Sequence, residues 1–155
     1  MAQLHLNEKV EVLKKIELFS DFTDYVLKEI ANVMEEIEVK KGITIINKNE
    51  DGNCMYVLYS GSVKIHDEDN KIAELHSVNI IGEMSLLTSE PRNASVTSIE
   101  DCKLLSLNQQ AFDVISEDNL EFYKAIVRVL IKKLQRQNFE LIEFSKNARR
   151  IMSLF

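Results

Sequence analysis

The four glycines of this 155-residue chain all lie between positions 42 and 82, where they alternate with short β-rich runs. Runs rich in isoleucine, valine, tyrosine and threonine that are bounded by turn residues predict short strands. The acidic segment 67–70 predicts a hairpin turn between two of them. Many short strands divided by turns favour a small antiparallel β-sandwich or jelly-roll barrel. The clearest strand-like runs are residues 43–46, 55–59, 63–65 and 95–99.

Helical spacing replaces this pattern on both sides of the central part. Apolar residues recur at helical intervals before residue 36, and the cluster at 20–23 offers a cap between two amphipathic helices. From Gln109 onward the strand signals cease. We therefore expect an α+β fold in a single domain, 1–155. Its parts are N-terminal helices over 7–35, a β-roll over 36–108 and a C-terminal helical segment over 109–155.

The C-terminal segment carries a heptad repeat that continues for more than three heptads. Such a repeat favours pairing with a second helix, and a parallel homodimer is the natural candidate. The alternative is one long helix that packs back onto the β-unit, as its first turns around Phe122 and Ile126 also suggest. The seam consists of Val127, Leu130, Leu134, Gln137, Leu141, Phe144, Ala148 and Ile151.

Composition restricts the class of protein. With 45% hydrophobic and 28% charged residues, the chain has the balance of an ordinary soluble domain. A formal net charge of −6 argues against a nucleic-acid-binding surface. The two cysteines, Cys54 and Cys102, are too few for a disulfide framework. Residues 1–10 lack the continuous apolar core of a signal peptide, and we expect no membrane-spanning run. We expect a cytoplasmic protein with no membrane association.

Signals of catalysis are weak throughout the sequence. The histidines His5, His66 and His76 have no metal-ligand spacing, and the common nucleophile, Walker and dinucleotide-binding motifs are missing. The acidic pairs resemble solvated turns and faces. We therefore expect a protein that is not an enzyme, with no catalytic residues, no metal and no cofactor.

One segment has the chemistry of an anion site. Gly82 permits a tight turn, and residues 84–88 can form about one helical turn that Pro91 would end. The first backbone N–H groups of such a helix attract anions. Arg92 offers a planar fork of donors to a phosphate, and the Glu83 carboxylate can accept from a sugar hydroxyl. Alternatively, Glu83 and Arg92 pair with each other or face solvent.

This segment resembles the phosphate-binding cassette of the cyclic-nucleotide-binding domain family, because Gly82-Glu83 and the run from Pro91 through Arg92 to 94–96 match its pattern. The resemblance covers roughly residues 18–138, including the turn glycines and the flanking helices. It implies Glu83 on the ribose 2′-hydroxyl, Arg92 on the cyclic phosphate, a cassette turn at Gly82 and Ser85, and Ala94 and Ser95 against the nucleotide. The predicted binding residues are Gly82, Glu83, Met84, Ser85, Arg92, Asn93, Ala94, Ser95, Gln137 and Asn138.

The match departs from the family pattern at two positions. Ile81 replaces a common aromatic residue, and Asn93, which can still donate to phosphate, replaces a small or hydroxyl residue. Ser95 carries the hydroxyl that the family associates with guanine, but serine also occurs there in relatives that use cAMP. We expect cAMP to be favoured over cGMP. Gln137 and Asn138 fall where the bacterial activator branch contacts the purine, although Gln137 could instead set the register of a coiled coil.

We expect the C-terminal helix to move when the nucleotide binds and so to carry the signal. Relatives that regulate transcription continue into a winged helix, whereas this chain stops at Phe155. We therefore expect no direct DNA binding and an effector protein of unknown identity. The main alternative is a dimerisation scaffold that keeps the fold without a ligand. A sensor for haem, an iron–sulfur cluster or an organic acid is disfavoured by Glu83, Arg92 and the lack of a cysteine cluster.

Overall fold

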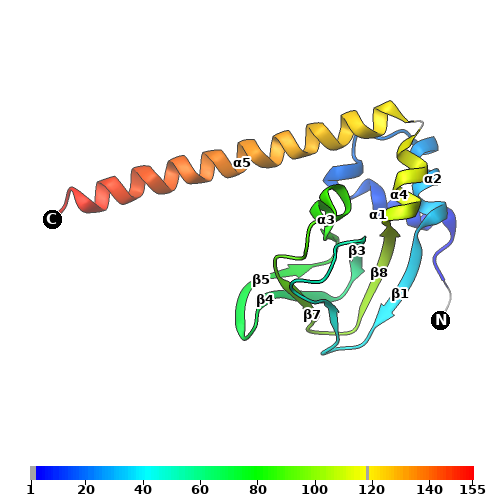
Figure 1. Ribbon diagram of the computed structural model, residues 1–155, viewed down its shortest axis with the longest axis horizontal. Coiled ribbons are helices and arrows are strands. Elements are labelled where there is room, and N and C mark those ends of the chain that lie inside the picture. The colour runs from blue at the N-terminus through cyan, green and yellow to red at the C-terminus, as the bar shows by residue number, and fades with distance from the viewer. Residues whose placement is uncertain (1–2, 118) are drawn as a thin grey trace.

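The computed structural model describes residues 3–117 and 119–155, and in chain order its β-roll is preceded and followed by helices (Figure 1). Thr23 begins the second helix as an N-cap, because its side-chain oxygen accepts from the Val26 N–H. The helices are α1 (Leu6–Lys14), the 3₁₀ helix η1 (Glu17–Phe19), α2 (Asp24–Val33), α3 (Glu83–Thr88), α4 (Gln109–Glu117) and α5 (Leu120–Met152). The strands are β1 (Glu35–Val39), β2 (Thr44–Ile46), β3 (Cys54–Ser60), β4 (Ser62–Asp67), β5 (Asn70–His76), β6 (Asn79–Ile81), β7 (Ser95–Ser98) and β8 (Cys102–Asn108).

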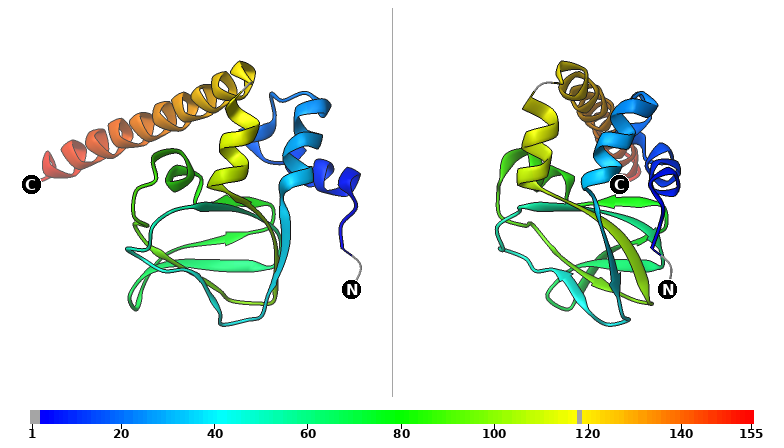
Figure 2. Two further views of the ribbon diagram at one scale, coloured as in Figure 1. Left: turned by 45° about the vertical axis from the view of Figure 1, so that its right-hand side comes forward. Right: turned by 90° about the vertical axis from the view of Figure 1, so that its right-hand side faces the viewer.

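The strands form two four-stranded antiparallel sheets, in the orders β1-β8-β3-β6 and β2-β7-β4-β5. The predicted fold class is therefore confirmed, as is the hairpin turn between Asp67 and Asn70. In the first sheet Val57 of β3 lies opposite Leu105 of β8. The helical elements gather at one end of the roll (Figure 2).

Strands β3 and β8 are buried on both faces, because successive side chains of a strand point to opposite sides of the sheet. Met55 and Val57 of β3 face the helices and belong to the core cluster that those helices cover. Leu58, the next residue, faces the second sheet and packs in the cluster inside the roll with Leu104. These two central strands thus join two hydrophobic cores and hold the helical layer on the roll.

The structure divides two segments that the sequence presents as continuous. Residues 72–81, whose sequence is typical of one strand, include most of β5 and all of β6, which belong to different sheets. The C-terminal segment contains α4 and a separate α5, whose N-cap Asn119 accepts from the Phe122 N–H at 3.2 Å. Because a strand pattern and a helix pattern both persist across these breaks, periodicity alone does not reveal them.

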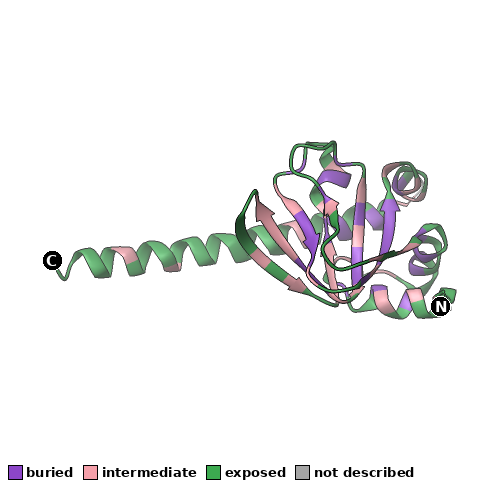
Figure 3. Cartoon of the chain, turned by 90° about the horizontal axis from the view of Figure 1, so that it is seen from below, coloured by how far each residue is buried: buried purple, intermediate pink, exposed green. Residues whose placement is uncertain are grey.

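Helix α5 is buried only near its beginning. Phe122, Ala125 and Ile126 are buried, whereas every residue from 131 to 142 is exposed. The helix crosses the helical end of the roll and then projects away from it (Figures 1 and 3). With 33 residues, it is about 50 Å long.

Candidate functional site

The segment between β6 and β7 forms a turn and a short helix, as the sequence predicts. Gly82 precedes α3 with a positive φ of 79°, and a Cβ atom there would lie 2.3 Å from an Arg92 guanidinium nitrogen. The helix ends at Thr88, before Pro91, because Ser89 adopts a left-handed conformation and donates to the Ser85 carbonyl at 2.8 Å. The proline therefore does not terminate α3.

Arg92 is buried, with 7% of its surface exposed, between α3 and the start of β3. Its guanidinium donates to the carbonyl of Gly82 at 3.2 Å and to the carbonyl of Cys54. In the described part of the chain, ion pairs form at Arg128 and Arg136 but not at Arg92. The predicted alternative, a direct pair between Glu83 and Arg92, is thus not formed. A buried cation is held here by neutral acceptors alone.

The ionisable groups beside Arg92 do not supply a compensating negative charge. Burial raises the pKa of the Cys54 thiol, and its hydrogen bond with Tyr56 and the charge of Arg92 only partly oppose this shift. Burial likewise raises the pKa of Tyr56 to about 12. Both groups are therefore neutral at physiological pH and do not offset the guanidinium charge.

Glu83, the first residue of α3, pairs with a residue far along the chain. Its Oε1 accepts from the Lys133 Nζ of α5 at 2.6 Å. The Glu83 side chain is 19% exposed and that of Lys133 is 45% exposed. This ion pair joins the cassette to α5.

Glu83 and Arg92 both line one cleft with a volume of about 670 Å³. Its walls come from α3, from both sheets, from the segment around η1 and from α5, which contributes Val129, Leu130, Lys133 and Arg136. The lining is mostly apolar, with four basic and two acidic side chains. The net charge of the lining is positive in a chain of formal net charge −6, which favours an anionic ligand over a cationic one.

Most of the predicted site residues meet at this cleft. Gly82, Glu83, Met84, Ser85, Arg92, Asn93 and Ala94 line it. Ser95 lies at its edge and is not part of the lining, since its side-chain oxygen accepts from the Lys48 backbone N–H at 2.9 Å. Gln137 and Asn138 are exposed on α5 beyond the cleft and do not line it within one chain.

Sequence reasoning missed three residues that shape the site. Lys133 and Arg136 are spaced as ordinary charged residues of a helix face, so nothing in their pattern assigns them to a cleft. Gly52 reads as a loop glycine, yet a Cβ atom there would lie 2.0 Å from the Ser85 Cβ. Position 52 requires glycine because it lies against Ser85 of α3. The local sequence around Gly52 does not indicate a contact with a residue 33 positions away.

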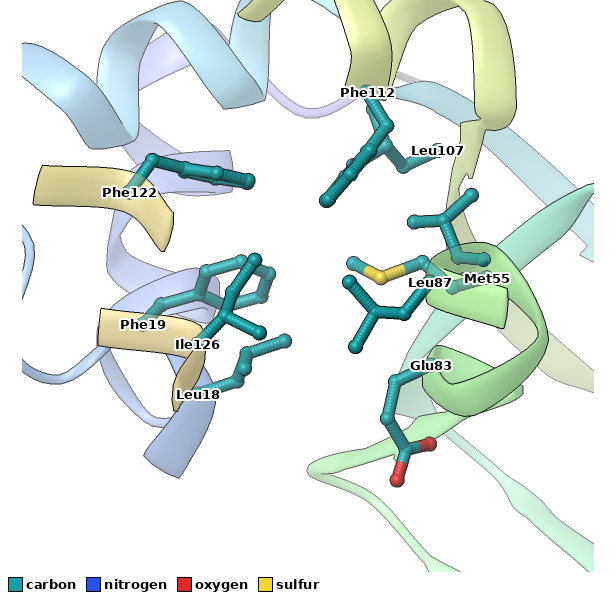
Figure 4. Close-up of a pocket in the computed structure, with 10 residues that line it drawn as sticks. Leu18, Phe19, Met55, Glu83, Leu87, Leu107, Phe112, Phe122 and Ile126 are labelled. Atoms are coloured by element: carbon teal, nitrogen blue, oxygen red, sulfur yellow. The ribbon is translucent and has the colours of Figure 1, made fainter. Parts of the chain in front are cut away.

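A second, much smaller cavity of about 10 Å³ lies where α5 meets η1 and α3. Its lining is apolar except for Glu83, and Figure 4 shows the Glu83 carboxylate pointing away from the surrounding rings and aliphatic chains. This volume is about that of one water-sized probe. Phe122 also stacks on Phe22, with ring centroids 5.1 Å apart. The packed residues around this cavity therefore anchor the start of α5 and do not form a ligand site.

Two further searches bear on the kind of site. Across residues 3–117 and 119–155, no three His, Cys, Asp or Glu side chains are grouped so that they could hold a metal ion. None of the described helices combines the length and hydropathy that a bilayer span requires. The cleft itself offers a guanidinium at Arg92 for an anion, a carboxylate at Glu83 that can accept from a ligand hydroxyl, and apolar walls.

Fold and cleft together define a ligand-binding regulatory module. Residues 36–119 match the family model described as "Cyclic nucleotide-binding domain", so the chain belongs to that family. The predicted resemblance is confirmed. The family is one of regulatory, non-catalytic modules.

Individual relatives show the same relationship. The chain is 24% identical over 138 residues to a "CRP-like cAMP-activated global transcriptional regulator" of Mycobacterium tuberculosis; this covers 86% of the chain and 62% of the regulator. The solved N-terminal domain of a transcriptional regulator from Streptomyces coelicolor superposes with a TM-score of 0.75 at 27% identity, covering 84% of the chain and 94% of that domain. The regulatory domain of Toxoplasma gondii PKA, solved with cAMP, gives 0.66 at 25% identity, covering 71% and 44%.

Proposed function

We propose that the chain is a sensor that binds a cyclic nucleotide in the cleft, with cAMP favoured over cGMP. Arg92 binds the cyclic phosphate, and Glu83 accepts from the ribose 2′-hydroxyl. Gly82, Met84 and Ser85 shape the turn around these groups, with Asn93 and Ala94 beside the nucleotide and Ser95 at its edge. The protein performs no chemistry on its ligand.

The observation that carries this proposal is the buried, uncompensated charge of Arg92. A buried ion without a counter-ion is costly, and the two carbonyls that hold Arg92 are neutral. A phosphate that enters the cleft supplies the missing charge and can use two guanidinium donors at once. Phosphate binding therefore relieves a cost that exists in the ligand-free chain.

Two observations support cAMP as the preferred ligand. The mycobacterial relative is described as cAMP-activated, and the Toxoplasma regulatory domain was solved with cAMP. The Ser95 oxygen accepts from the Lys48 backbone N–H, which leaves its own O–H free, so this hydroxyl does not by itself select a base. The apolar walls, which include Ile65, Leu75 and Leu130, suit either purine. Discrimination then depends on α5, including Gln137 and Asn138 of a paired subunit.

Helix α5 provides the route from binding to output. Leu130 and Lys133 of this helix line the cleft. Another face of the helix carries exposed apolar residues, among them Ile131 and Leu134. A second copy of the chain fits this face, since two such stripes bury each other in a coiled coil. The nucleotide then shifts the position of α5 within a homodimer, and an effector protein responds to that shift.

Calorimetric titration of cAMP and cGMP into the wild type and Arg92→Ala tests the proposal. We expect the wild type to bind cAMP more tightly than cGMP, and Arg92→Ala to lose at least about 30-fold in affinity, because truncating a buried charge partner costs about 2 kcal/mol or more. Arg92→Lys, which keeps the charge without the fork, should fall between them. Arg128→Ala, on the part of α5 outside the cleft, should bind like the wild type.

The ligand-free scaffold is the other function that a specific observation favours, namely the exposed apolar face of α5. It predicts that the wild type sediments as a stable dimer and binds neither cAMP nor cGMP in the calorimetric titration. That combination would overturn the sensor proposal and leave the scaffold standing.

A further inference from the structure

The ion pair of Lys133 with Glu83 joins α5 to the cleft. Beyond Leu130, the hydrogen bonds and ion pairs that join α5 to the remainder of the described chain are this pair and a second one from Arg136 to Glu17 at 3.3 Å. Upstream of Leu130, by contrast, Phe122 and Ile126 are packed in the core. The distal part of α5 is thus held near the cleft by charges alone.

These charges meet at the carboxylate that the proposed function assigns to the ribose. Lys133 and Glu83 line the same cleft, and their 2.6 Å contact places the ammonium in front of the carboxylate. We infer that Lys133 competes with the ligand for Glu83, an inference that rests on the proposed function. A nucleotide whose 2′-hydroxyl binds Glu83 replaces Lys133 and so releases the distal part of α5 from α3.

The relative strength of the two interactions determines which one persists. An ion pair whose lysine is nearly half exposed contributes little, because water and salt screen it. A hydroxyl that donates to a charged carboxylate inside an occupied cleft forms a stronger bond. The phosphate on Arg92 holds the ribose in place, so the hydroxyl reaches Glu83 without a further loss of translational freedom. The ligand therefore displaces the lysine.

Release at Lys133 affects the whole distal part of α5. Residues 120–152 include neither glycine nor proline, the usual causes of a kink, so the helix moves as a stiff rod. Its pivot is Ile126, the last buried residue of α5. Residue 133 is about 10 Å from Ile126 along the helix and residue 152 is about 39 Å away, at 1.5 Å per residue. A displacement at Lys133 is therefore enlarged nearly fourfold at the end of α5.

The test compares Lys133→Met with Lys132→Met, which removes the same charge at the adjacent position, outside the cleft lining. Affinities for cAMP and 2′-deoxy-cAMP are measured by calorimetry. Lys133→Met should bind cAMP about fivefold more tightly than the wild type, because no ion pair has to be broken. Its affinity for 2′-deoxy-cAMP should be unchanged, since that ligand leaves Glu83 with its lysine. Lys132→Met should match the wild type with both.

The distance between spin labels at two exposed positions, Ile72 and Phe144, provides a second readout, because a displacement of α5 as a rod changes it. Binding of cAMP should change this distance in the wild type, 2′-deoxy-cAMP should not, and Lys133→Met should show the changed distance without ligand. Weaker binding of cAMP by Lys133→Met would overturn the inference, because Lys133 would then be a ligand contact. Equal tightening for both nucleotides would also overturn it. A wild type that binds neither nucleotide contradicts the proposed function itself, a result distinct from these.

Discussion

At the scale of single residues, Arg92 and Gly82 form one unit. The guanidinium lies against the backbone of Gly82, where a side chain would collide with it. The sequence suggests Gly82 as a turn residue and Arg92 as a phosphate ligand, each for its own chemistry. Their mutual dependence follows only from the packed structure, because it depends on a distance between atoms ten residues apart.

Gly82→Ala and Gly42→Ala separate this packing from backbone strain. Both glycines have a positive φ, of 79° and 84°, but a Cβ atom at Gly42 meets nothing within 4 Å. We expect Gly42→Ala to lose about 1 kcal/mol of unfolding free energy in urea and to keep its nucleotide affinity. Gly82→Ala should lose more stability and most of its affinity. Equal affinities in the two variants would show that Arg92 tolerates a methyl group beside it.

At the scale of elements, α5 differs most from expectation. The predicted seam includes Leu130, but this residue faces the cleft and packs against the core, whereas Ile131 beside it is 49% exposed. By contrast, Val127, Leu134 and Leu141 of the predicted seam are exposed. A heptad repeat identifies the apolar side of a helix. Which residues of that side pack against the rest of the domain, and which stay exposed, depends on tertiary packing.

Pairing through α5 is tested by placing charges on the exposed face. Ile131→Glu and Leu134→Glu should give monomers in sedimentation velocity, because each buries a carboxylate in the interface. Val114→Glu, at a residue of α4 that is 72% exposed, is the matched control and should leave the oligomeric state unchanged. If all three variants sediment as the wild type does, α5 is not the dimer interface.

At the scale of the whole molecule, the β-roll was predictable and the route of the chain through it was not. Alternating apolar residues and turn signals predict β2, β3, β4 and β7 within one or two residues of their ends. They carry no information on pairing, which joins β1 to β8 across some 70 positions. Likewise, the cassette residues were predictable from a contiguous motif, whereas Lys133 and Arg136 reach the cleft only through the path of α5.

The half-buried Glu36 carboxylate ties the N-terminal segment to the first sheet, and we expect it to make global stability depend on pH. Burial alone would raise the pKa of Glu36, but the Tyr59 hydroxyl, the Leu4 N–H and nearby lysines outweigh it and lower the pKa. A lowered pKa in the folded state gives stability that is complete above the unfolded value, about 4.3, and is lost as the pH falls through the folded value.

Tyr59→Phe tests this linkage through urea unfolding at pH 7 and pH 3. The variant should be about 1 kcal/mol less stable at pH 7, because it lacks the hydrogen bond to the carboxylate. It should then lose less stability than the wild type on going to pH 3, since its Glu36 pKa lies nearer the ordinary value. Parallel losses in the two proteins would mean that Tyr59 does not set the pKa of Glu36.

Helix α5 presents Leu130 and Lys133 to the cleft and Ile131 and Leu134 to solvent within one helical turn. Any molecule that covers the outer face therefore also influences the inner one, and the influence is reciprocal. If a second copy covers it, subunit association and nucleotide binding are linked by mass action. The nucleotide level needed for a response would then change with the amount of the protein in the cell, so its expression level would itself be an input.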